Sequence, residues 1–151
     1  MSIMNVVEQF FHEDDWKYDD SHRNDEILST GINAENGSFK LHYLCDEKGQ
    51  TLRVIAMLNT NIPEAKRGTV AEFIVRCNYI YKMGHLDMDF SDGEVRFVWG
   101  IDVEGGELTS QMVKRMTYIA FASIDDVQPY LMKICYGDMT PEDAYKQWRE
   151  N

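Results

Sequence analysis

The sequence predicts an α+β fold in which helices pack on one side of an antiparallel sheet of about five or six strands, because three observations agree. Several stretches alternate apolar and polar residues, as half-buried strands do, and others repeat apolar residues every three or four positions, as amphipathic helices do. The pairs Asn36-Gly37 and Asp92-Gly93 separate neighbouring alternating stretches, as hairpin turns do. With 151 residues, 44% of them hydrophobic, the chain can bury a core and is expected to form one domain over 1–151.

The N-terminal part of the chain is expected to contain one helix followed by strands. Residues 3–11 place apolar side chains at helical spacing, which predicts a short amphipathic helix. Aromatic and charged residues alternate over 16–19 and favour a short edge strand there. Alternation then predicts strands over 27–33 and 39–45, and a turn at 47–49 closes the next hairpin.

The strand expected over 50–59 is apolar on both of its faces. One face carries Leu52, Val54, Ala56 and Leu58, and the other carries Ile55 and Met57. A strand with two apolar faces is covered on both sides, so we expect it in the middle of the sheet or at an interface. Ile55 and Met57, on the second face, are therefore the candidate surface for a partner protein or for a second copy of the chain.

Residues 62–103 are expected to form one helix followed by one hairpin. Pro63 fixes the backbone at the entrance to the helix, and Gly84 is its expected end. Between them, apolar side chains recur at the spacing of one buried helical face: Val70, Phe73, Ile74, Cys77 and Tyr81. Alternation over 86–90 and 95–101 predicts the two strands of a hairpin with one apolar and one mostly polar face.

Two helices are expected after this hairpin. Thr109 or Ser110 is suited to cap the first of them. Its apolar stripe is expected to consist of Met112, Met116, Ile119, Ala120, Ser123 and Val127. Pro129 is expected to kink or divide this helix. The Thr-Pro pair at 140–141, followed by two acidic residues, predicts the start of a final helix that Trp148 docks.

The order and spacing of residues between 63 and 96 resemble the YbjN-like family, small bacterial proteins labelled as sensory-transduction regulators. The residues that carry the resemblance are Pro63, Arg67, Val70-Ala71-Glu72, Asn78-Tyr79, Gly84, Asp87 and Asp92-Gly93-Glu94-Val95-Arg96. The similarity extends from Phe39 to Tyr145. It implies a fold similar to that of type III secretion chaperones, which are typically small, acidic homodimers that hold an extended segment of a partner.

Charge and composition argue against nucleic acids and membranes as partners. The formal net charge is −11, whereas nucleic acid and anionic lipid surfaces both demand a basic footprint. The chain has no apolar run near the roughly 20 residues of a membrane helix, and its first residues do not resemble a signal peptide. The three cysteines lie far apart, which suits a reducing compartment. The expected location is therefore cytoplasmic.

The sequence contains no pattern of residues that is typical of catalysis, of a metal site or of a bound cofactor. The four histidines have no zinc-like spacing, and no nucleotide-binding or nucleophile motif is present. Asp87 and Asp89, two residues apart on a strand, point to one face and could form a carboxylate pair. Any half-exposed strand shows the same alternation, so a solvated face is the favoured interpretation. We expect no catalytic, cofactor-binding or metal-binding residue.

Two hypotheses about function follow. The first is a non-enzymatic interaction module, chaperone-like or regulatory, that binds a protein partner through a sheet face or edge and forms a homodimer, as the resemblance implies. The second is a sensory domain that binds a small ligand in a pocket between sheet and helices, lined by Tyr43, Trp99, Tyr118 and methionines. An enzyme is not expected, because the polar side chains that catalysis needs are missing.

Overall fold

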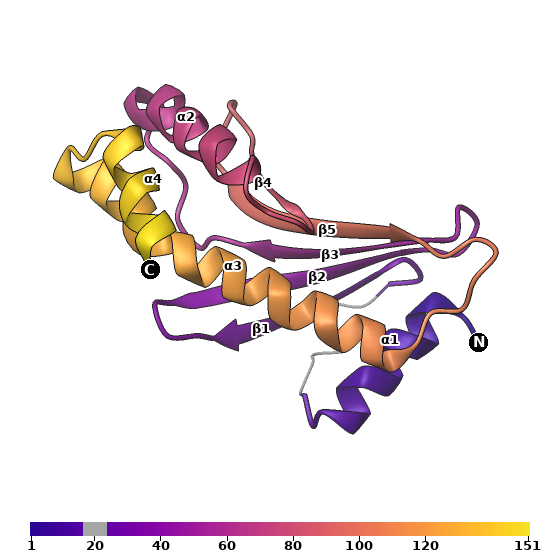
Figure 1. Cartoon of the computed structure of the whole chain (residues 1–151). Coiled ribbons are helices and arrows are strands. Elements are labelled where there is room, and N and C mark those ends of the chain that lie inside the picture. The colour runs from indigo at the N-terminus through magenta and orange to yellow at the C-terminus, as the bar shows by residue number, and fades with distance from the viewer. Residues whose placement is uncertain (17–23) are drawn as a thin grey trace.

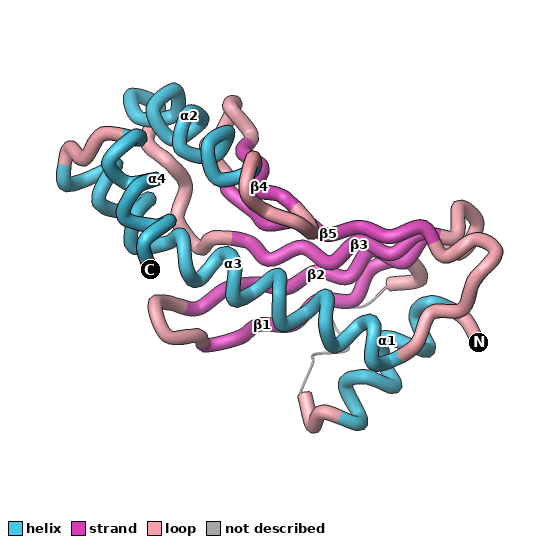
Figure 2. Tube along the Cα trace, in the orientation of Figure 1, coloured by secondary structure: helices cyan, strands magenta, loops and turns pink. Residues whose placement is uncertain are grey.

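The computed structural model describes residues 1–16 and 24–151, and within them four α-helices accompany one five-stranded antiparallel sheet. The elements are α1 Ile3–Glu13, β1 Ile27–Asn33, β2 Ser38–Asp46, β3 Thr51–Met57, the 3-10 turn η2 Glu64–Lys66, α2 Arg67–Asn78, β4 His85–Met88, β5 Val95–Asp102, α3 Ser110–Gly137 and α4 Pro141–Glu150. The α+β class and the one-sided packing of helices are confirmed (Figures 1 and 2). The edge strand predicted over 16–19 lies, apart from Trp16, outside the described residues.

The sheet has the strand order β1-β2-β3-β5-β4, and every neighbouring pair is antiparallel. The central position predicted for β3 is confirmed, since it lies between β2 and β5. The chain leaves the sheet after β3, forms α2, and returns through the short edge strand β4 before β5 pairs with β3. The long helix α3 then runs across one face of the sheet (Figure 1).

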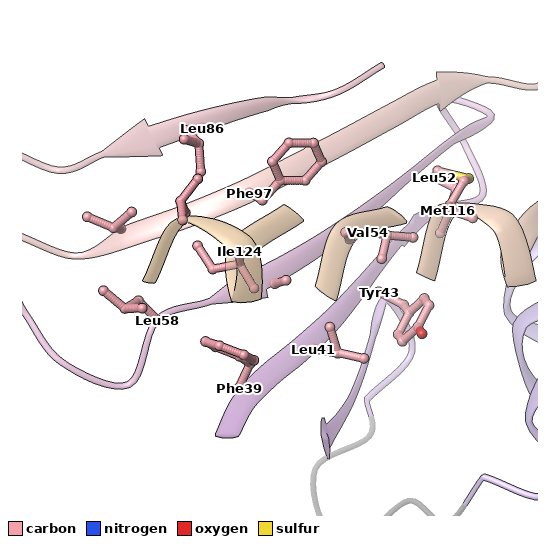
Figure 3. Packing of buried hydrophobic residues seen from close by; sticks show 14 of the residues in the cluster. Phe39, Leu41, Tyr43, Leu52, Val54, Leu58, Leu86, Phe97, Met116 and Ile124 are labelled. Atoms are coloured by element: carbon pink, nitrogen blue, oxygen red, sulfur yellow. The ribbon is translucent and has the colours of Figure 1, made fainter. Parts of the chain in front are cut away.

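The core lies between α3 and the sheet. Alternate residues of the strands point towards α3 and are buried: Leu28, Phe39, Leu41, Tyr43, Cys45, Leu52, Val54, Ala56, Leu86, Val95 and Phe97. Met116 and Ile124 of α3 face this layer, as Figure 3 shows. The alternating apolar residues of each stretch therefore point to the buried face of the sheet, and the residues between them point to the other face.

Helix α1 is attached at one end of the core. The Ser2 hydroxyl caps it, and the Glu47 carboxylate accepts hydrogen bonds from the amides of Ile3 and Met4 at 2.8 and 3.1 Å. A carboxylate at a helix N-terminus satisfies free amides and complements the helix dipole. The turn between β2 and β3 therefore holds α1 in place, as well as reversing the chain.

Helix α3 is continuous from Ser110 to Gly137, so the expectation that Pro129 divides it is wrong. Proline has no amide hydrogen, which leaves the Asp125 carbonyl without its helical donor. Asn36, in the turn between β1 and β2, donates from Nδ2 to that carbonyl at 3.1 Å. The Asn36 amide also donates to the Asp125 side chain at 2.7 Å. The turn between β1 and β2 thus supplies the hydrogen bond that proline removes from the helix.

Helix α2 is shorter than predicted. It begins at Arg67 after the 3-10 turn that follows Pro63, and it ends at Asn78 well before Gly84. The Asn78 side chain accepts from the Leu86 amide at 2.8 Å and donates to the Leu86 carbonyl at 3.0 Å. The end of α2 is therefore fixed against the edge strand, by a contact that the helical pattern does not show.

The hairpin and the start of α3 also differ in detail from the prediction. Strand β4 ends at Met88, and Phe90 is 60% exposed, because Asp89 turns the chain by bonding the Ser91 amide at 2.8 Å. Gly93 has φ +80°, and a side chain there would collide with the Ile62 carbonyl. Met112 is exposed; the buried stripe of α3 begins instead at Val113.

The predicted caps of the last two helices are confirmed. Thr109 accepts from the Met112 amide, and Thr140 accepts from the Asp143 amide with Pro141 in the first turn. The Trp148 ring lies against the Tyr81 ring, with centroids 5.4 Å apart. Helix α4 is thereby docked next to α2 and the end of α3 (Figure 1).

Candidate functional site

The described helices leave one face of the sheet uncovered, and we call it the open face. Tyr43 points towards α3, where its hydroxyl is 2.7 Å from the Thr117 hydroxyl, so the adjacent residue on either side points away from the helices. The strand register extends the open face across the sheet. One row across all five strands consists of Ser29, His42, Ile55, Val98 and His85.

Apolar side chains lie among the polar ones on the open face: Ile27, Leu44, Ile55, Met57 and Val98. Ile55 and Val98 are only 3% and 4% exposed, although neither belongs to the core beneath α3. Met57 is half-buried. The structure therefore brings Ile55 and Met57 onto one face, as predicted, and Met57 is the more exposed of the two. Their role in binding stays a prediction.

The open face also gathers basic side chains, in a chain whose net charge is −11. Lys40, Arg53 and Arg96 project from β2, β3 and β5. A hollow of about 490 Å³ lies between β3, β5 and the loop before β4, and we call it the basic hollow. It is lined by Arg53, Lys82, Met83, Gly84, His85, Asp87, Arg96, Val98, Trp99 and Gly100.

The cations of the basic hollow differ in their partners. Arg96 donates from Nη2 to the Asp87 carboxylate at 3.1 Å, and His85 Nε2 lies 3.6 Å from the same oxygen. Arg53 and Lys82 form no hydrogen bond or ion pair with any residue that the structure describes. Two unpaired cations therefore remain after Asp87 has been satisfied.

A second hollow of about 290 Å³ lies on the other side of Arg53. It is lined by Glu26, Ile27, Leu44, Cys45, Asp46, Thr51 and Arg53. Because Arg53 lines both hollows, they are neighbours on the open face. Ile27 and Leu44 give the second hollow an apolar part. The Asp46 carboxylate is engaged in its own turn, where it accepts from the Gly49 amide at 2.7 Å.

Asp87 and Asp89 do not act as a carboxylate pair. Asp87 is bonded to Arg96 on the open face. Asp89 accepts from both the amide and the hydroxyl of Ser91, and these bonds lower the pKa of its carboxyl. Each carboxylate therefore has a structural partner of its own.

The three cysteine thiols are buried. Cys45 and Cys77 are 1% and 0% exposed, and burial raises the pKa of each thiol to about 12. Cys135 is buried as well, and its pKa is raised for the same reason. Such thiols stay protonated near neutral pH and are poor nucleophiles. Residues 1–16 and 24–151 contain no group of three His, Cys, Asp or Glu side chains placed to hold a metal ion.

The aromatic residues predicted to line a ligand pocket are not brought together. Tyr43 is fully buried and contacts the Phe11 ring, with centroids 5.2 Å apart. Tyr118 lies at the surface of α3, 40% exposed, where its hydroxyl donates to Asp14 at 2.7 Å. Trp99 packs partly buried against the core. The small-ligand hypothesis stays a prediction that these residues do not support.

Comparison with known proteins places the chain in a family. A family model described as "Putative bacterial sensory transduction regulator", YbjN, matches residues 4–132. The chain belongs to the YbjN family. In this YbjN protein the match spans α1, the whole sheet, α2 and most of α3, and therefore every residue of the open face. The resemblance seen in the sequence is confirmed.

Two further comparisons concern curated proteins and solved structures. No functionally curated protein matches the sequence of this YbjN protein. A chain in the structure of the HopA1-SchA chaperone-effector complex is similar to it with a TM-score of 0.49 and 17% sequence identity, over 81% of this chain and 88% of that chain. None of the described helices of this YbjN protein has the length and apolar character needed to span a membrane.

Sequence reasoning missed the basic hollow of this YbjN protein. Arg53 and Arg96 occupy polar positions in their strands, where a charged residue is ordinary. Lys82 lies in the loop before β4. The available signal was that Arg53 shares a strand face with Ile55 and Met57, the residues selected as a surface. Only the strand order shows that β3 and β5 are neighbours.

Proposed function

We propose that this YbjN protein is a non-enzymatic interaction module, chaperone-like or regulatory, that binds a partner protein through the open face of its sheet. The observation that carries the proposal is the composition of that face. A solvated sheet face is ordinarily polar. The open face of this protein instead combines the apolar side chains of Leu44, Met57 and their neighbours with two cations, Arg53 and Lys82, that have no described partner. This occurs in a chain whose net charge is −11. Charge complementarity therefore favours an acidic protein surface with apolar residues.

The description of the family as a regulator of sensory transduction fits a function carried out by binding. The buried thiols and the separately engaged carboxylates among the described residues offer no group suited to covalent or acid–base chemistry. Edge pairing is the other route that was predicted; β1 and β4 form the two edges of the sheet. The composition of the open face favours the face over the edges.

The experiment that tests this proposal is site-specific photo-crosslinking in the bacterium that makes the protein. The photoreactive residue replaces Lys40, which is exposed on the open face, and in a control it replaces Arg115, which is exposed on α3. A partner captured at position 40 and not at position 115 is then purified, and its dissociation constant is measured. Capture at 115 alone, or at neither position, contradicts the proposal.

The affinity measurement uses two substitutions on the open face, Met57→Glu and Leu44→Glu. Both residues are half-buried, so they can be changed with less risk to the fold than Ile55, whose replacement by a charge would bury that charge. Each variant should weaken binding by about tenfold or more. The control Val75→Glu, at a 69% exposed position of α2, should leave the affinity unchanged. Equal losses for all three variants would refute the open face as the binding surface.

The homodimer expected from the resemblance is examined with the same variants. If a second copy occupies the open face, Met57→Glu should convert the dimer to a monomer in sedimentation velocity, and Val75→Glu should not. A protein that sediments as a monomer at all concentrations contradicts the dimer and leaves the partner experiment unaffected.

A further inference from the structure

We propose that the basic hollow binds an acidic side chain of an extended partner segment, with Arg53 as the main contact. This inference rests on the proposed function and specifies the chemistry of the partner. The hollow lies on the open face, and it contains the two cations that have no described partner.

Arg53 is placed to meet a carboxylate from the partner. Its register neighbour on β5 is Gly100, and a Cβ atom at Gly100 would lie 3.0 Å from Arg53 Cγ. The arginine stem therefore lies close against Gly100, where an added side chain would crowd it. A guanidinium presents a planar fork of donors that matches a carboxylate in a bidentate manner. Lys82, from the loop before β4, adds a second cation to the same hollow.

The ion pair between Arg96 and Asp87 fixes the side chains on the other side of the hollow. Asp87 neutralises Arg96 and has His85 beside it, so these side chains hold one another. An incoming carboxylate would approach Arg53 and Lys82 without displacing Asp87. Since the chain has a net charge of −11, an acidic segment is repelled by most of the surface and attracted only where cations gather, as they do in the basic hollow.

The second hollow adds a preference for an apolar side chain near the acidic one. Leu44, Arg53 and Gly100 are register neighbours on β2, β3 and β5. Strands lie about 4.8 Å apart, so Leu44 and Gly100 are separated by about 10 Å. An extended peptide covers that distance in about three residues. Side chains two residues apart lie on the same face of an extended segment. The preferred segment therefore carries an acidic side chain with an apolar side chain two residues away, the apolar one resting on Leu44 and Ile27.

The test uses synthetic octapeptides and the full chain. One peptide repeats Leu-Ser-Glu-Ser, which places leucine and glutamate two residues apart on one face of an extended segment. Two matched peptides have glutamine or lysine in place of every glutamate. Affinities are measured by fluorescence anisotropy at physiological ionic strength. The glutamate peptide should bind at least about tenfold more tightly than the glutamine peptide, and the lysine peptide should not bind. Failure of the glutamate peptide to bind, or equal binding of the glutamine peptide, overturns the proposal.

Substitutions then locate the site. Arg53→Gln should weaken binding of the glutamate peptide by about tenfold, and Lys82→Gln should weaken it by a smaller factor. Arg115→Gln on α3 and Lys48→Gln in the turn before β3 remove the same charges elsewhere and should have little effect. Equal losses for Arg53→Gln and Arg115→Gln would show a general charge effect and overturn the proposal.

Two further measurements distinguish an acidic-peptide site from a site for a small anion, and a failure of this inference from a failure of the proposed function. If inorganic phosphate displaces the peptide far better than chloride at equal ionic strength, the hollow is a site for a small anion and the proposal is wrong. If Arg53→Gln leaves binding of the crosslinked partner intact while Met57→Glu abolishes it, the proposed function stands and only the acidic contact fails. Loss in neither variant refutes the proposed function itself.

Discussion

Removal of the Thr117 hydroxyl is expected to destabilise this protein more than removal of the Tyr43 hydroxyl to which it is bonded. Both residues are 0% exposed, and their hydroxyl oxygens are 2.7 Å apart. The Thr117 hydroxyl donates to the Val113 carbonyl at 2.8 Å. Its single hydrogen is thereby used, so the Tyr43 hydroxyl is the donor to Thr117.

The two substitutions leave different groups unsatisfied. Thr117→Val preserves the shape of the side chain but leaves the Tyr43 hydroxyl buried without an acceptor, which costs about 1–3 kcal/mol. Tyr43→Phe removes the donor, while Thr117 keeps its bond to Val113, so the loss is that of one hydrogen bond, about 0.5–1.5 kcal/mol. In the double variant no buried hydroxyl is left unpaired. Its loss of stability should therefore be smaller than the sum of the single losses.

The assay is urea-induced unfolding of the wild type and the three variants, followed by tryptophan fluorescence. Free energies of unfolding are compared where the slopes against denaturant agree. The expected order of destabilisation is Thr117→Val above Tyr43→Phe, with a coupling energy of about 1 kcal/mol in the double-mutant cycle. A Tyr43→Phe variant at least as unstable as Thr117→Val, or additive effects, would refute the assigned direction of the hydrogen bond.

Other expectations concern the backbone and the thiols. Alanine at Gly93 (φ +80°) and Gly105 (φ +77°) should cost about 1–2 kcal/mol each for the left-handed backbone. Gly93→Ala should lower the melting temperature further, because only there does the added carbon meet backbone; equal shifts would contradict this. Asn36→Ala should lower the free energy of unfolding in urea by about 1–2 kcal/mol, because the Asp125 carbonyl loses its donor. The loss should be smaller in a Pro129→Ala background, where the amide of residue 129 donates to that carbonyl. Identical losses in both backgrounds would show that the Asp125 carbonyl does not need the Asn36 donor. The buried thiols, with pKa values of about 12 at Cys45 and Cys77, should react with Ellman's reagent at about pH 8 far more slowly in the native protein than in urea; rapid reaction of the native protein would contradict their burial.

Local patterns predicted most elements because each rests on interactions between residues close in sequence. Ser38–Asp46 alternates apolar and polar residues, and Thr140 with Pro141 forms a helix start, whatever lies elsewhere in the chain. The errors occurred where distant residues decided the outcome. Asn78 ended α2 because it could bond β4, and α3 continued through Pro129 because Asn36 satisfied the freed carbonyl.

The candidate site was likewise predicted in part from the sequence and decided in part by the tertiary structure. Ile55 and Met57 were selected from the sequence because the two faces of one strand can be read from alternation alone. The partners of that strand cannot be read in this way, since strand order and register depend on packing between segments far apart in the chain. The sequence by itself therefore determined which side chains of each strand share a face. Only the tertiary structure decided that Arg53, Lys82 and Arg96 line one hollow, because β5 pairs with β3 and the loop before β4 lies beside them.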